Sequence, residues 1–160
     1  MPSKQATSYG LETVEGMGIR SISQEVLYSD FVDGGSTAGT MTLRKKLPAY
    51  CFPIGTKIKV VTGFTGDSSC SLQVGTSTTT LVAGVVDADI LTMDTTKSIY
   101  TSGKTYMQYA TFTDTETVQD DDQTVASNYI LLTATSGSDW GLVTAGKMTV
   151  TVYYLSTVPE

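Results

Sequence analysis

The fold class is indicated most clearly by residues 56–75, TKIKVVTGFTGDSSCSLQVG. Apolar and charged side chains alternate in its first half, so they fall on opposite faces of an extended chain. Residues 65–68, TGDS, are typical of a tight turn, and the alternation resumes after them. The stretch therefore predicts a half-buried antiparallel hairpin. In the first strand, Ile58, Val60 and Thr62 lie on one face and Lys57, Lys59 and Val61 lie on the other. In the return strand, Leu72 and Val74 share one face.

Similar patterns recur on both sides of this predicted hairpin. Residues 147–155 predict a long strand with Met148, Val150, Val152 and Tyr154 on one face and Tyr153 on the other. The remaining predictions are a strand pair over 19–31, strands over 40–47, 106–112 and 129–135, and short core strands over 81–86 and 90–93. About eight short strands separated by turn signals are typical of a β-sandwich or jelly roll. We therefore predict an all-β chain, with one antiparallel, jelly-roll-like β-sandwich over residues 17–160.

Composition narrows the partners that the chain can bind. Its 160 residues suit one domain, and the charged share of 16% is low against about 25% in an average globular domain. A formal net charge of −6 repels phosphate backbones, so we expect no direct contact with nucleic acid. No stretch approaches the roughly 20 apolar residues that cross a bilayer. We expect a soluble protein that is made in the cytoplasm and has no membrane partner.

Two places in the sequence are candidate interfaces. Residues 1–16 are polar apart from Tyr9, Leu11 and Val14, which predicts an extended N-terminal arm that becomes ordered only on a partner surface. Trp140 lies in a turn rich in Gly and Ser, where two interpretations stay open. An exposed indole would anchor an interface or stack on a sugar, whereas a buried one would close one end of the core.

The sequence offers no convincing catalytic, cofactor or metal site. It has no histidine, which removes the commonest general base and the commonest metal ligand. Residues 34–40 imitate a phosphate-binding loop but lack its lysine, so we interpret them as a flexible turn. The acidic run 120–122 lacks the glycine and glutamate of a calcium loop and is interpreted as a solvated loop. Asp87 and Asp89 are interpreted as turn residues and not as a glycosidase pair. We expect no enzyme activity and no cofactor.

The two cysteines are predicted to stay reduced. Cys51 and Cys70 would lie far apart in the predicted hairpin, unless the chain reverses at Pro53. A reducing compartment also disfavours a bridge between them.

Several turn and strand segments resemble a pattern of tailed-bacteriophage virion proteins. The segments are LP at 47–48, IGTKIKVVT at 54–62, FTGD at 64–67, SLQVGT at 71–76 and the closing strand GKMTVTVYYL at 146–155. Similar segments recur in small β-sandwich domains that decorate phage heads or form fibre bases. This chain departs from the pattern by inserting AYCFP at 49–53. The resemblance covers about a third of the chain and carries over no catalytic residue.

The resemblance implies a decoration, or cement, protein on the exterior of a phage capsid, assembled in the host cytoplasm. Its partners would be the major capsid protein and copies of itself in a closed cyclic oligomer, with a trimer preferred. Strand edges and a polar arm are suited to such contacts. Two alternatives stay open, a carbohydrate- or receptor-binding module of a phage fibre and a component of the neck or tail tube.

Overall fold

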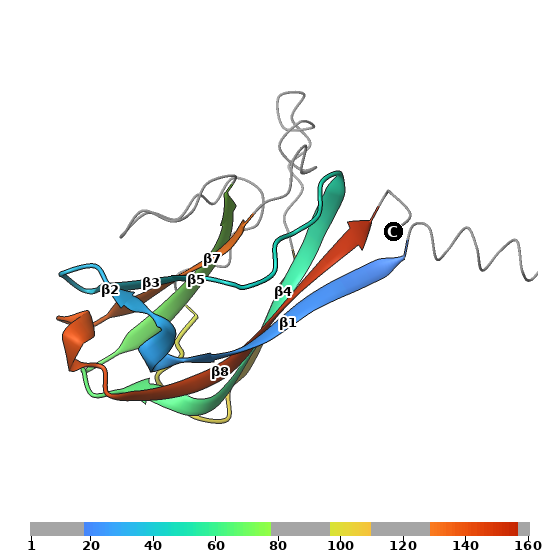
Figure 1. Ribbon diagram of the computed structural model, residues 1–160. Coiled ribbons are helices and arrows are strands. Elements are labelled where there is room, and N and C mark those ends of the chain that lie inside the picture. Colours follow the sequence, from blue (N-terminus) through green and yellow to red (C-terminus); the bar gives the residue numbers. More distant parts are fainter. Residues whose placement is uncertain (1–17, 78–96, 110–128, 157–160) are drawn as a thin grey trace, which may run out of the picture.

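Two antiparallel sheets enclose one hydrophobic core in the computed structural model, which describes residues 18–77, 97–109 and 129–156 (Figure 1). The first sheet has the order β1-β8-β4-β6, formed by β1 (Ile19–Leu27), β8 (Ala145–Ser156), β4 (Cys51–Thr65) and β6 (Thr105–Tyr109). The second has the order β2-β3-β7-β5, formed by β2 (Val32–Asp33), β3 (Ala38–Thr42), β7 (Tyr129–Ser136) and β5 (Cys70–Ser77). The prediction of an all-β sandwich is confirmed.

Helical structure in the described residues is limited to two short 3₁₀ turns, η1 (Tyr28–Asp30) and η2 (Trp140–Leu142). None of the described helices is long and apolar enough to cross a membrane.

Strand β8 shows why the alternating sequence determines the buried face. Every second residue from Gly146 to Ser156 is buried, and the residues between them are partly exposed. Met148, Val150, Val152 and Tyr154 enter the core as predicted, while Tyr153 lies on the outer face. Fully burying an aliphatic side chain of this size contributes about 1.5–3 kcal/mol. A shift of one residue would turn this whole set toward solvent, so the register of β8 is strongly specified.

The predicted hairpin over residues 56–75 is wrong in its pairing. Strands β4 and β5 lie in different sheets, because β4 pairs with β8 and β6 while β5 pairs with β7. The predicted turn exists, but it carries the chain from one sheet to the other. Gly66 in this turn has a φ of 120°, and a β-carbon there would lie 2.2 Å from the carbonyl oxygen of Leu142. Only glycine fits this position without strain.

The faces of the two strands follow the prediction except at one place. Ile58, Val60, Leu72 and Val74 are buried, as the alternation predicted. Thr62 is exposed instead of sharing the face of Val60, because the register of β4 against β8 shifts between these two residues. The shift is a β-bulge, in which an extra residue reverses the faces that follow.

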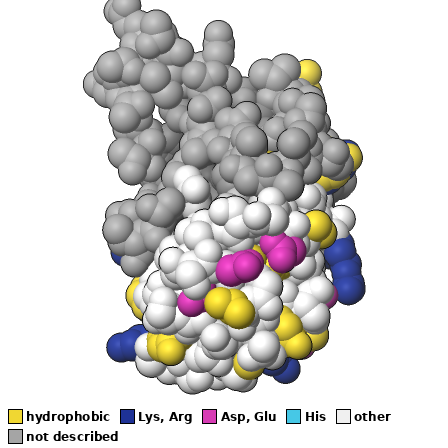
Figure 2. Space-filling model, turned by 90° about the vertical axis from the view of Figure 1, so that its left-hand side faces the viewer, with side chains coloured by type: hydrophobic (Ala, Val, Ile, Leu, Met, Phe, Trp, Pro, Cys, Tyr) yellow, Lys and Arg dark blue, Asp and Glu magenta, His cyan; other side chains and the backbone are white. Residues whose placement is uncertain are grey.

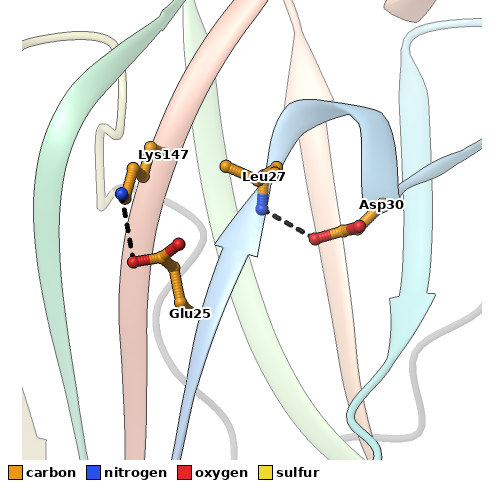
Figure 3. Close-up of polar contacts among 4 residues, drawn as sticks. All are labelled: Glu25, Leu27, Asp30 and Lys147. Atoms are coloured by element: carbon orange, nitrogen blue, oxygen red, sulfur yellow. Dashed lines mark hydrogen bonds and ion pairs between the residues drawn. The ribbon is translucent and has the colours of Figure 1, made fainter.

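The segment 19–31 also differs from its prediction. It forms one strand, β1, followed by the turn η1, and not a strand pair. The Asp30 carboxylate accepts a hydrogen bond of 2.8 Å from the backbone N–H of Leu27, which stabilises this turn (Figure 3). The predicted strand 40–47 is shorter than expected, since β3 ends at Thr42, although Leu43 is also buried.

Several predicted features lie outside the described residues. They are the arm 1–16 with Tyr9, Leu11 and Val14, the apolar runs 81–86 and 90–93, the pair Asp87 and Asp89, and the acidic run 120–122.

Candidate interaction surfaces

Trp140 closes the core at the end of the sandwich where η1 and η2 lie. Its side chain is 5% exposed, and its ring centroid lies 5.0 Å from that of Phe31. Gly39 of β3 leaves room for the indole, because a β-carbon at Gly39 would lie 2.3 Å from the ring. The backbone N–H of Trp140 donates to the carbonyl of Ser36 at 2.9 Å. Of the two interpretations of Trp140, the buried one is therefore correct, and its ring is not available as a surface anchor.

A carboxylate joins the two loops beside this end of the core. Asp67 accepts hydrogen bonds from the backbone N–H groups of Ser68 at 2.6 Å, Ser138 at 2.6 Å and Asp139 at 3.1 Å, and from the Ser138 hydroxyl at 2.9 Å. These hydrogen bonds hold the pKa of Asp67 well below its usual range, and the bond from the Ser138 N–H has the largest effect. The ionised carboxylate thus holds the sheet-crossing turn against the loop before η2.

The surface outside Trp140 combines acidic and apolar side chains. We call it the loop-end surface and define it by Val32, Asp33, Asp139 and Leu142, all of which are exposed. Figure 2 shows acidic side chains gathered beside hydrophobic ones at this end of the molecule. The carboxylates of Asp33 and Asp139 both approach Gly141, since a β-carbon there would lie 3.4 Å from an oxygen of each. No group of three potential metal ligands occurs in the part of the chain that the structure describes. The surface suits a basic or mixed protein surface better than a polyanion.

A second surface lies on the outer face of the first sheet, near the opposite end of β8. Here a hollow of about 210 Å³ is lined by one residue or more from each strand of the sheet. We call it the apolar hollow, and its lining residues are Ile19, Ile54, Gly55, Met107 and Tyr153.

Local sequence explains how the apolar hollow forms. Gly55 pairs with Tyr153 across β4 and β8, and the absence of a side chain at Gly55 leaves a space beside the tyrosine. The register shift between Pro53 and Gly55 makes Ile54 an extra residue that also lines the hollow. Ile19 is 69% exposed and Met107 is 49% exposed, which is unusual for apolar side chains of this size on one small area.

Positive charge continues from the apolar hollow along the outer face of β4. Lys57 pairs with Met107 of β6 and with Thr151 of β8, and Lys59 follows two residues later on the same face. Among the described residues, no carboxylate forms an ion pair with either lysine. Among the described residues, an ion pair of 3.1 Å joins Lys147 of β8 to Glu25 of β1, nearer the other end of β8 (Figure 3). The hollow therefore has a cationic side.

Both cysteines are buried, and no disulfide joins Cys51 to Cys70 in the structure. Burial raises the pKa of the Cys70 thiol to about 12, and the negative charge of Asp67 adds to this effect. A buried thiol of high pKa is a poor nucleophile and a poor metal ligand, so Cys70 is a packing residue.

Comparison with known proteins relates this fold to viral structures. No protein-family model matches the chain, and no curated protein sequence matches it. One similar solved structure is described as the capsid of Ralstonia phage GP4. Its chain is 11% identical with a TM-score of 0.55, and the match covers 87% of this chain and 84% of that one.

Two further structures were compared. The acidic stable capsid structure of Helicobacter pylori bacteriophage KHP30 gives 14% identity, a TM-score of 0.43 and coverage of 89% and 95%. The structure of the infectious bursal disease virus Gx strain gives 13% identity, a TM-score of 0.34 and coverage of 87% and 37%. The TM-scores of these two structures are too low to indicate a shared fold. The chain thus shares its two-sheet fold with a chain of the Ralstonia phage GP4 capsid structure.

Proposed function

We propose that this chain is a structural protein of a bacteriophage virion that binds the assembled capsid and reinforces it as a decoration protein. The observation that carries the proposal is the fold likeness to a chain of a phage capsid structure, which extends over most of both chains. The sequence agrees with a binding role, because it lacks histidine and its net charge of −6 disfavours contact with nucleic acid.

The proposed partners are the major capsid protein and further copies of this chain on the exterior of the virion. A decoration protein needs one contact with the lattice and another with its neighbours. The loop-end surface and the apolar hollow, near opposite ends of β8, support such a division. A closed cyclic oligomer, with a trimer preferred, would protect β1 and β6, which are the edge strands of the first sheet among the described residues. The arm residues Tyr9, Leu11 and Val14 are the proposed contacts with neighbours and with the capsid.

The two alternatives receive less support. A fibre module that binds carbohydrate would use an exposed aromatic ring, and the burial of Trp140 removes the ring that the sequence offered for this role. A neck or tail-tube component would form hexameric rings in electron micrographs of the purified protein.

The test uses particles of the phage that encodes this chain, assembled without it. Purified protein is added to these particles at increasing concentration, and the bound fraction is measured by co-sedimentation. We expect saturable binding, and particles that resist heat or low salt better once they are decorated. Absence of binding at any concentration would refute the capsid role.

A full-chain variant with serine at Tyr9, Leu11 and Val14 then tests the arm. We expect it to fold as the wild type does, because the described strands begin only at Ile19. It should bind the particles at least tenfold more weakly. Equal binding would mean that the contact lies on the sandwich, and Leu142→Lys would then test the loop-end surface.

A further inference from the structure

We infer that the apolar hollow receives the N-terminal arm, residues 1–16, of a second copy of this chain. This inference deepens the proposed function, and it rests on that function in taking the protein to associate with itself. It names the surface at which two copies meet.

The chemistry of the hollow favours a protein side chain over a small molecule. Its volume of about 210 Å³ is below the roughly 300–1,000 Å³ of typical ligand pockets. Its lining residues are aliphatic, aromatic or glycine, so they supply none of the convergent charged groups that orient a small ligand. An apolar side chain on an extended segment needs no such groups, because burial alone stabilises it.

The arm has the matching composition. It contains Leu11 followed by Glu12, and Val14 followed by Glu15. Each apolar side chain therefore has a carboxylate beside it. In the hollow, Met107 has Lys57 as its neighbour on β4, so an apolar site lies directly beside a cation. A leucine in the hollow would bring the adjacent glutamate toward the lysines of β4, which have no carboxylate partner among the described residues.

Geometry favours the arm of a second copy over the arm of the same chain. The described chain starts at Gly18, directly before Ile19, which itself lines the hollow. To place Leu11 in the hollow of its own chain, the arm would have to reverse direction within residues 12–18. An extended arm of 16 residues spans about 50 Å, which is enough to reach a neighbouring molecule. Because the origin of the arm and the hollow lie on the same surface, two or more copies can exchange arms in a closed assembly.

Photo-crosslinking of the full-length protein tests the inference. The photoreactive residue p-benzoylphenylalanine is placed at position 11 instead of Leu11. Protein labelled with ¹⁵N is mixed with unlabelled protein, and the mixture is irradiated without capsids. We expect a covalent dimer in which position 11 of one copy is joined to the peptide that contains Met107 or Tyr153, with both labels in the crosslinked peptide pair. Crosslinked peptide pairs that never combine the two labels, a crosslink to another region or no crosslink would overturn the inference.

Two matched variants of the receiving copy provide the control. Met107→Lys and Val61→Lys each place a lysine at an exposed apolar position, with exposed fractions of 49% and 47% in the wild type. Only Met107 lines the hollow. We expect Met107→Lys to reduce the yield of dimer at least tenfold and Val61→Lys to leave it unchanged, with both folded by circular dichroism. Equal yields from the two variants would overturn the inference.

Failure of this inference is distinguishable from failure of the proposed function. A protein that forms the crosslinked dimer without binding particles would lose the proposed function but keep the arm exchange. A protein that binds particles without forming the crosslink would keep the proposed function and lose the arm exchange.

Discussion

Gly39 of β3 provides the space that the Trp140 ring occupies, and this contact can be tested through its energy. A β-carbon at Gly39 would lie 2.3 Å from the indole, which is far inside van der Waals contact. The ring is 5% exposed and packs against Phe31, so it has little room to move away. We expect Gly39→Ala to lower the free energy of unfolding by about 1–3 kcal/mol, the usual cost of overpacking a core.

The sign of this effect should reverse when the ring is removed. Glycine inside a strand is about 0.5–1 kcal/mol less favourable than alanine when nothing clashes. In a Trp140→Ala background, Gly39→Ala should therefore be neutral or stabilising. Trp140→Ala alone should cost about 3–5 kcal/mol, which a domain with a stability of about 5–15 kcal/mol can tolerate.

The assay is urea unfolding of the four proteins of this double-mutant cycle. Far-UV circular dichroism is the appropriate signal, because Trp140 is the single tryptophan and two of the proteins lack it. The expected coupling between the two sites is at least about 1 kcal/mol. An equal cost of Gly39→Ala in both backgrounds would show that the indole does not lie over Gly39, and would refute the burial of Trp140 described above.

Four further predictions concern ionisable groups. Neither Cys51 nor Cys70 should react with a thiol reagent at pH 8 in the native protein, and both should react after denaturation. The pKa of Cys70 is raised from 9.0 to about 12 in the folded protein, so its contribution to stability should be complete below pH 9 and lost between about pH 9 and 12. Unfolding measured as a function of pH should show this loss in the wild type and not in Cys70→Ala. The pKa of Asp67 is lowered in the folded protein, so its contribution to stability should be present above pH 4 and lost as the pH falls further. In thermal unfolding, Asp67→Asn should have a lower midpoint than the wild type at pH 7 and should lose less stability in acid. Glu25→Gln should change the free energy of unfolding by less than about 1 kcal/mol, since its ion pair with Lys147 is exposed, and a larger loss would indicate a role beyond this pair.

The sequence predicts which faces are buried much better than which strands pair. In β8 and in β4 from Thr56 to Val60, strict alternation is sufficient, because a side chain on a strand has only two sides. The partner of a strand depends on contacts with distant residues. The turn after β4 leads into the other sheet, where Asp67 binds the loop at Ser138, and nothing within residues 56–75 indicates that contact. A short turn between two amphipathic strands predicts a hairpin by default, and here that default is wrong.

For the candidate surfaces too, the sequence predicts which side chains face outward but not which strands bring them together. Period-two alternation correctly predicts that Lys57 and Tyr153 lie outside the core, but the apolar hollow needs Gly55 and Met107 beside them. That arrangement exists only once β6, β4 and β8 are in register. The exposure of Trp140 was undecidable from its own turn, since the space for its ring comes from Gly39 of another strand.

The position of the central strands has a consequence for how the protein folds during synthesis. In the first sheet β8 lies between β1 and β4, and in the second β7 lies between β3 and β5 (Figure 1). Strands β8 and β7 both follow their two neighbours in the chain, so a nascent polypeptide that ends before residue 129 cannot complete either sheet. Until the ribosome has translated residue 156, β1 and β4 present unpaired edges that could join strands of other nascent chains. Both sheets therefore form only after β7 and β8 have been synthesised, and their formation is dominated by contacts between distant segments, which makes it slow. Chaperones that hold the emerging chain should therefore affect the yield of this protein more than they affect a domain built from local hairpins.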